Sequence, residues 1–278
     1  MKCRAYAKVN LGLDVASKRE DGYHELKSVM VPIQLHDLID INVHHEMRFE
    51  CVPNFLIHPE KNTLLKMIEV CREKYKFTEN FAIRLFKHIP SQAGLGGGSS
   101  DAAAVLNYLD YYFKWNLTPQ EKIDLAVQVG ADVPFCLFEK PALVTGIGEK
   151  LEFFENRTSF WMVLVQPRKG VSTKKAFEGL DIPNLVHPNI DRIKESLMNN
   201  KYNQFIDSID NSLEKKAISL VPEIKRLKEL LIDLGCDRSM MTGSGSVVMG
   251  FSQSEVVIDN CIKTLRKQSR FVRKTKIL

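Results

Sequence analysis

A chain of 278 residues that is 44% hydrophobic and 26% charged has the composition of a soluble globular protein and the length for two domains. No apolar run is long enough to span a membrane, and the first residues lack the apolar segment of a signal peptide, so we expect a cytoplasmic protein without membrane contact. The six cysteines form no Cys-x-x-Cys pair, which argues against a zinc site and against a disulfide framework.

The net charge of +5 comes from one end of the chain. Residues 263–278 hold seven Lys and Arg and no Asp or Glu, and the remainder is close to neutral. Such a basic end could bind nucleic acid, or it could be the solvated face of a last helix and strand. We expect the second arrangement and no nucleic-acid partner.

The first half of the chain contains both strand and helix patterns. Alternation predicts a strand over 4–15 and a turn at Asp21-Gly22, and β-branched runs predict further strands over 26–43 with an interruption at Pro32. Residue spacing and cap signals then predict a helix over 62–75, a strand over 81–85, a helix over 102–113, and a helix that begins with the capping box Thr118–Glu121 and stops at Gly130.

The second half has the same mixture. It predicts a strand over 160–166, an amphipathic helix over 221–234, a strand–loop–strand over 240–251, a helix over 254–267 and a strand over 271–277. Because strands and helices do not alternate regularly, the pattern indicates an α+β fold.

A glycine-rich run occupies positions 94–98 and precedes Ser99, Ser100 and Asp101. Glycine lets backbone N–H groups approach a phosphate without Cβ atoms in the way, and the start of a helix favours an anion. The run is neither a Walker A motif nor a dinucleotide fingerprint, and a tightly packed glycine turn is the alternative. We interpret Asp101 as an ordinary acidic residue of a first helical turn.

Three separated motifs occur together in this chain. They are Ala7-Lys8-Val9-Asn10-Leu11 with Arg19-x-Asp21-Gly22-Tyr23-His24; Pro90-x-x-Ala93-Gly94-Leu95-Gly96-Gly97-Gly98-Ser99-Ser100-Asp101-Ala102-Ala103 with Gly130-Ala131-Asp132-Val133-Pro134-Phe135; and Met241-Thr242-Gly243-Ser244-Gly245-Ser246. In this order and spacing they resemble the GHMP kinase superfamily, and more narrowly its 4-diphosphocytidyl-2-C-methyl-D-erythritol kinases of the non-mevalonate isoprenoid pathway.

The resemblance implies a two-domain α+β fold and a reaction. The N-terminal, ATP-binding domain would cover 1–157 and contain a left-handed βαβ unit, against the usual right-handed rule. The C-terminal domain would cover 158–278 and be ferredoxin-like, with the active site in the cleft between the two. The implied reaction is ATP-dependent phosphorylation of the 2-hydroxyl of a cytidine-diphosphate-bearing methylerythritol, giving the 2-phosphate and ADP.

The resemblance also assigns the catalytic pair. Phosphoryl transfer needs charge neutralisation and a group that accepts the hydroxyl proton, and Asp132 would be that group while Lys8 keeps it ionised. By spacing alone, Asp132 could instead form an Asx-turn before Pro134, and Lys8 could lie at a strand edge. The resemblance favours the catalytic interpretation.

The remaining site residues are implied in the same way. ATP would be held by Pro90, Ser91, Gln92, Ala93, Gly94, Leu95, Gly96, Gly97, Gly98, Ser99 and Ser100, with Mg²⁺ near Ser100. The acceptor would be bound by Asn10, Tyr23, His24, Thr173, Phe177, Thr242, Gly243 and Ser244. Tyr23 and Phe177 would stack on the cytosine and His24 would hydrogen-bond its edge. A core aromatic is the alternative for Phe177, and a plain hairpin turn for Thr242–Ser244.

Two other functions compete with this one. Homoserine or mevalonate-type kinases would share the glycine run but lack the Asp-Gly-Tyr-His segment. A nucleic-acid binder would use the basic residues 263–278 instead. We expect a small-molecule kinase that is a monomer or a weak homodimer.

Overall fold

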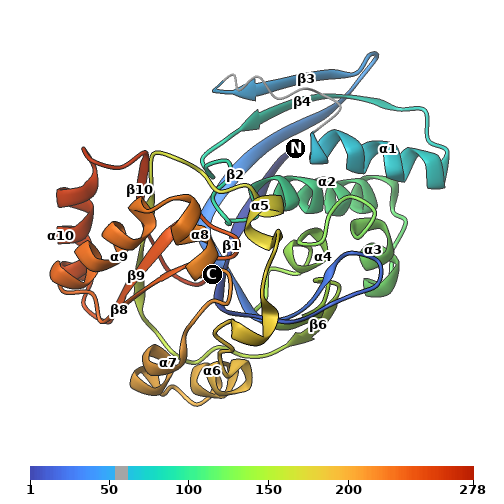
Figure 1. Cartoon of the computed structure of the whole chain (residues 1–278). Helices are drawn as coiled ribbons and strands as arrows, with labels where there is room; N and C mark the ends of the chain where they lie inside the picture. Colours follow the sequence, from blue (N-terminus) through green and yellow to red (C-terminus); the bar gives the residue numbers. More distant parts are fainter. Residues whose placement is uncertain (54–61) are drawn as a thin grey trace. The chain divides into compact units, whose positions relative to one another are not determined.

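The computed structural model describes residues 1–53 and 62–278 (Figure 1). The chain forms two compact units that interleave along the sequence. Unit 1 comprises Met1–Lys8, Leu35–Ile89 and Gly96–Glu139, and unit 2 comprises Val9–Gln34, Pro90–Leu95 and Lys140–Leu278. The sequence division into domains 1–157 and 158–278 stays a prediction.

Two long strands, β1 (Lys2–Lys18) and β2 (His24–His44), contribute residues to both units. The strand predicted over 4–15 is confirmed, but the interruption at Pro32 is wrong because β2 is continuous. β2 pairs with β5 (Ala142–Gly146) through residues 26–30 and with β4 (Asn80–Phe86) through residues 38–44. Pro32 lies between these two registers, so its missing N–H breaks neither ladder.

Unit 1 packs two helices against strands. Strand β3 (Arg48–Val52) runs parallel to β4, and helices α1 (Thr63–Tyr75) and α2 (Gly97–Phe113) lie side by side (Figure 1). Helix α3 (Pro119–Ala126) begins with the predicted capping box, and the short α4 (Val133–Cys136) follows it. Buried residues of these elements share one hydrophobic core, among them Met67, Phe81 and Leu106. The left-handed sense of a βαβ unit stays a prediction.

Helix α2 begins at Gly97, five residues earlier than the predicted start at Ala102. The N–H of Ser100 donates to the carbonyl of Gly96 at 2.8 Å, so the glycines themselves form the first helical turn. Glycine is a poor helix former, which is why spacing alone placed the start too late.

Unit 2 contains a four-stranded antiparallel sheet in the order β10–β7–β9–β8, from β7 (Trp161–Gln166), β8 (Arg238–Met241), β9 (Val248–Ser252) and β10 (Phe271–Thr275). Helices α9 (Glu223–Asp233) and α10 (Glu255–Leu265) pack along it (Figure 1). With α9 directly before β8 and α10 directly before β10, the expected ferredoxin-like arrangement is confirmed.

The rest of unit 2 consists of short elements. They are β6 (Lys150–Phe153), α5 (Thr173–Phe177), the 3₁₀ turn Ile182–Asn184, α6 (Ile190–Met198), α7 (Tyr202–Ser208) and α8 (Glu214–Leu220). Within the described residues, no helix has both the length and the apolar character needed to cross a bilayer.

Candidate active site

The predicted catalytic pair meets inside unit 1. The Nζ of Lys8 lies 3.3 Å from Oδ2 of Asp132, and the lysine side chain is 4% exposed while the aspartate side chain is 42% exposed. Asp132 is the N-cap of α4, yet its side chain makes no cap bond within the described part of the chain. The Asx-turn alternative therefore does not describe Asp132. One buried ammonium faces one accessible carboxylate.

The start of α2 packs against the Lys8 side chain. Gly96 has a φ of +68°, and a Cβ there would lie 2.9 Å from Cγ of Lys8, so only glycine fits both the conformation and the space. Among the described residues, no side chain caps this helix. Its first N–H groups, its partial positive charge and the Lys8 ammonium together favour a polyanion.

Ser100 does not fit a magnesium ligand. Its hydroxyl lies 2.7 Å from the carbonyl of Tyr6 and 2.9 Å from that of Gly96, and the residue is 2% exposed. A Mg²⁺ ligand oxygen has to face the ion directly, whereas this oxygen lies against two carbonyls. Mg²⁺ therefore stays a prediction without an assigned protein ligand.

Asp101 is not the first-turn acid that we expected, because α2 begins at Gly97 and its first turn holds no acidic residue. It is buried and lies in an ionic cluster, where the Nζ of Lys87 is 2.7 Å from Asp101 and also contacts Asp37. Asp37 in turn accepts from the N–H of Ile89 at 2.8 Å. Burial raises the pKa of Asp101 to about 7, although Lys87 opposes the rise. Burial by itself would lower the pKa of Lys87, but Asp101 and Asp37 raise it overall.

The first half of the glycine motif is held by unit 2. The N–H groups of Ser246 and Val247 donate to the carbonyls of Gln92 and Ala93 at 3.3 and 3.2 Å. A Cβ on Gly94 would lie 2.4 Å from the carbonyl oxygen of Thr242, so these two loops touch backbone to backbone. The segment Thr242–Ser246 is thus a partner of the glycine motif as well as a turn between β8 and β9.

Four predicted acceptor residues form contacts in unit 2. The N–H of Asn10 donates to Oγ1 of Thr242 at 2.8 Å, and the hydroxyls of Thr173 and Ser244 are 3.0 Å apart. The Asn10 amide also donates to Ser28 at 2.8 Å, which fixes its orientation.

Two predicted aromatic residues are neighbours. The rings of His24 and Phe177 lie with centroids 5.2 Å apart, and Phe177 also packs at the margin of the unit 2 core. Burial, and secondarily Lys18, lower the pKa of His24, which favours a neutral imidazole that can both donate and accept. Tyr23 is 57% exposed, so its ring is available to a ligand.

Some residues that shape these loops escaped the sequence analysis. Lys87 and Asp37 belong to no motif, and only their burial reveals them. Gln166 ends the apolar strand β7, and its amide donates to the carbonyl of Ser91 at 2.9 Å. The one feature of the sequence that could have indicated a role for Gln166 is its polar side chain at the end of an otherwise apolar strand.

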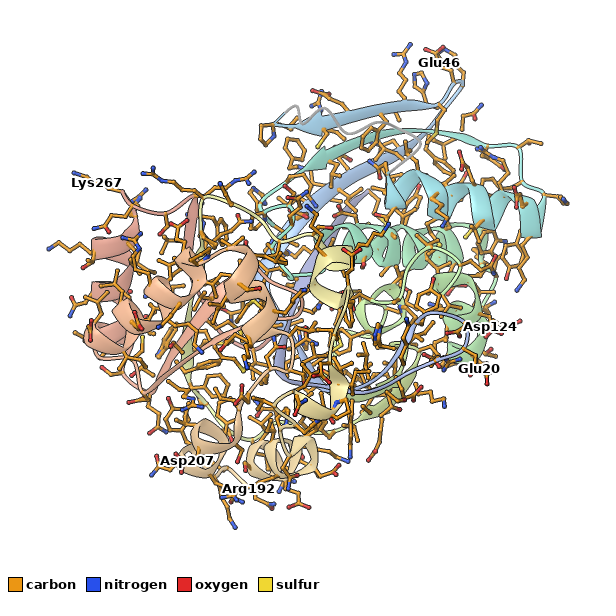
Figure 2. The ribbon with its side chains drawn as sticks, viewed as in Figure 1. Glu20, Glu46, Asp124, Arg192, Asp207 and Lys267 are labelled. Atoms are coloured by element: carbon orange, nitrogen blue, oxygen red, sulfur yellow. The ribbon has the colours of Figure 1, made fainter. Side chains whose placement is uncertain are left out.

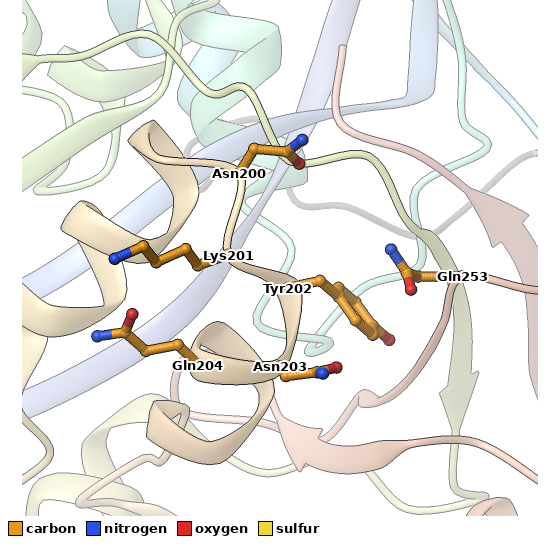
Figure 3. Close-up of a pocket in the computed structure, with 6 residues that line it drawn as sticks. All are labelled: Asn200, Lys201, Tyr202, Asn203, Gln204 and Gln253. Atoms are coloured by element: carbon orange, nitrogen blue, oxygen red, sulfur yellow. The ribbon is translucent and has the colours of Figure 1, made fainter.

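Two other surface features of unit 2 lie apart from the predicted site residues. A polar hollow of about 420 Å³ is lined by Asn200, Lys201, Tyr202, Asn203, Gln204 and Gln253 (Figure 3). In the basic end, Lys274 pairs with Glu255 and Asp259, and Lys276 lies over the ring of Trp161. Lys267 projects outward from the end of α10 (Figure 2). These contacts favour a solvated face.

Comparison with known proteins identifies the family of this chain. The model of the GHMP kinases N terminal domain matches residues 62–140, and that of the GHMP kinases C terminal domain matches residues 181–270. The chain belongs to the GHMP kinase family. Kinases of this family use ATP, and we therefore regard the chain as an ATP-dependent small-molecule kinase.

Relatives within the family carry a narrower name. Proteins named 4-diphosphocytidyl-2-C-methyl-D-erythritol kinase are 36% identical in Bacillus cytotoxicus, over 89% of this chain and 86% of that protein, and 35% identical in Clostridium beijerinckii, over 98% of each. A crystal structure of a 4-(cytidine 5'-diphospho)-2C-methyl-D-erythritol kinase is 30% identical and covers 100% of this chain and 99% of its own, with a TM-score of 0.85.

Proposed function

We propose that the chain transfers the γ-phosphoryl group of ATP to the 2-hydroxyl of 4-diphosphocytidyl-2-C-methyl-D-erythritol in the non-mevalonate isoprenoid pathway. The observation that carries the proposal is the Lys8–Asp132 ion pair beside the uncapped, glycine-built start of α2, among the described residues. The names of the full-length relatives support the choice of acceptor.

The chemistry divides between these residues. The hydroxyl oxygen forms a bond to the γ-phosphorus, the bond from that phosphorus to the β–γ bridging oxygen breaks, and ADP leaves. Asp132 accepts the hydroxyl proton. A carboxylate suffices as the proton acceptor because the loose transition state of phosphoryl transfer needs little deprotonation of the nucleophile. Lys8 offsets the negative charge on the equatorial oxygens.

Acceptor recognition is assigned to unit 2. Tyr23 and Phe177 would stack on the cytosine, and the neutral His24 beside Phe177 would pair with the polar edge of the base. Asn10, Thr173, Thr242, Gly243 and Ser244 would contact the rest of the acceptor, and Pro90–Ser100 the phosphates of ATP. Mg²⁺, the cytoplasmic location and a monomeric or weakly dimeric state remain predictions.

The test is a coupled ADP-release assay across a panel of alcohols. We expect turnover of the cytidylated erythritol and none of homoserine or mevalonate. Turnover of homoserine and of no other alcohol in the panel would refute the proposed acceptor. Asp132→Ala should lower kcat by about 10²–10⁴-fold with ATP binding retained, because it removes the proton acceptor and leaves Lys8 and α2 in place.

A further inference from the structure

Two buried polar side chains, Asn211 in the turn before α8 and Glu214 at the start of α8, contact the backbone where β8 leads into the segment Thr242–Ser246. Asn211 is 2% exposed and Glu214 is 7% exposed. The turn is itself anchored to β1, where Ser212 donates to the carbonyl of Leu13 at 2.9 Å and Leu13 donates to that of Asp210 at 3.1 Å. All of these groups belong to unit 2. The turn can therefore act as a rigid support.

Asn211 brackets Thr242 on its two sides. Its amide nitrogen donates to the carbonyl of Met241 at 2.9 Å and to that of Gly243 at 2.8 Å, while its amide oxygen accepts from the N–H of Leu213 at 2.9 Å. All the hydrogen-bonding atoms of this side chain are thus in use. An aspartate has the same shape but no donors, so it would place an oxygen against two carbonyl oxygens.

Glu214 holds the neighbouring peptide group. One carboxylate oxygen accepts from the N–H of Met241 at 2.7 Å, and the other pairs with Lys228. The backbone entering the loop is therefore fixed at both its N–H and its carbonyl.

This bracket determines which way one N–H group points. In a trans peptide the carbonyl and the following N–H point in opposite directions. The Gly243 carbonyl faces Asn211, so the N–H of Ser244 faces the other side. Among residues 1–53 and 62–278, no protein group accepts from that N–H. Gly243 has a φ of +56°, a conformation that glycine adopts without strain and that makes this orientation accessible.

We propose that Asn211 is a positioning residue of the kinase: it turns the Gly243–Ser244 peptide so that the N–H of Ser244 is presented to an anionic oxygen of the bound phosphates. This inference rests on the proposed role of Thr242–Ser244 in the active site. An N–H fixed before the reaction stabilises charge that develops on such an oxygen without reorganisation. Loss of this N–H orientation should therefore reduce kcat more than it raises the KM for ATP or for the acceptor.

The experiment compares Asn211→Asp with three controls. Asn203→Asp makes the same chemical change on an exposed residue of α7, Glu214→Gln keeps an acceptor for Met241, and Lys228→Gln removes the ion pair of Glu214 alone. We expect Asn211→Asp to lower kcat about 10- to 100-fold with KM values for ATP and acceptor within threefold. The controls should keep kcat within threefold, even where the melting temperature falls.

A purely structural role for Asn211 predicts a different result. Asn211→Asp would then lower the melting temperature with an unchanged kcat per folded molecule, and this outcome overturns the proposal. Hydrogen exchange of the peptide spanning 242–247 gives a readout that needs no substrate. It should accelerate in Asn211→Asp and not in Asn203→Asp; equal exchange in both would refute the bracket. If the wild type phosphorylates a different alcohol, the proposed function fails, while the exchange result and kcat on that alcohol still decide the role of Asn211.

Discussion

Replacement of Gly96 by alanine should disable the kinase through Lys8. The residue caps α2 in a left-handed conformation, and the missing Cβ leaves the space that the lysine stem fills. The substitution adds one methyl group and removes no hydrogen bond. Any effect must therefore come from backbone strain and from displacement of Lys8.

Backbone strain and overpacking each contribute to the destabilisation. An alanine at a φ of +68° costs about 1–2 kcal/mol. Its Cβ would lie 2.9 Å from Cγ and 3.2 Å from Cε of Lys8, a residue that is 3% exposed and has little room to retreat. Overpacking of this kind costs about 1–3 kcal/mol. We therefore expect a total destabilisation of about 2–5 kcal/mol.

The catalytic effect follows from the same displacement. A shift of the lysine stem changes the 3.3 Å separation of Nζ and Oδ2 of Asp132. Misplacement of a reacting group by about 1 Å costs about 10²-fold in rate, so kcat should fall by that order. Steady-state kinetics and urea unfolding measure the two effects on the same sample.

Gly179→Ala is the matched control for strain. Gly179 has a φ of +65°, and no described atom lies within 4 Å of the position that its Cβ would take. This variant should lose only the conformational part, about 1–2 kcal/mol. If Gly96→Ala is no less stable than Gly179→Ala and turns over like the wild type, the packing of Lys8 against Gly96 is refuted.

Three further predictions concern other parts of the chain. The pKa of Asp101 is raised from 3.8 to about 7 in the folded protein, so its stabilising contribution is present below pH 3.8 and is lost as the pH rises toward 7. The free energy of unfolding of the wild type should therefore fall relative to that of Asp101→Asn between pH 5 and 7. If urea unfolding shows the same pH dependence for both proteins, this prediction is contradicted. Phe177→Ala should raise the KM for the acceptor about 3- to 10-fold and leave that for ATP unchanged, because only one face of the cytosine stack is removed; equal changes in both would argue against the stack. Asn62→Ala should lower the free energy of unfolding by about 1 kcal/mol, since the Asn62 side chain accepts from the N–H of Leu64 at 2.9 Å, and an unchanged urea midpoint would count against that cap.

Much of the architecture was predictable because it depends on local patterns. The capping box at Thr118 and Glu121 joins residues three apart, and α9 buries Ile224, Leu227 and Leu231 at helical spacing. The predicted interruption of the strand at Pro32 was wrong, because the effect of a proline depends on which hydrogen-bond ladder its N–H would join. That ladder is set by distant strands.

For the candidate site too, some features were predictable from the sequence and others were not. The motifs around Lys8, Gly96 and Asp132 indicated a phosphate site and a catalytic pair, and the structure brings these three residues together. Ser100 has the residue type of a metal ligand, but its hydroxyl lies against the carbonyls of Tyr6 and Gly96. Residue type is visible in a sequence, whereas the partner of a hydroxyl is not.

The family and most helices and strands were predictable from residue types and near neighbours, and so was the proposal of a glycine-built anion site. The surroundings of Asp101 and Asn211, in contrast, depend on the tertiary structure. The carboxylate of Asp101 became part of a buried cluster through Lys87, and the Asn211 amide became a bracket through carbonyls thirty or more positions away. Burial and long-range hydrogen bonds change what a polar side chain does, and both arise only when the chain is folded.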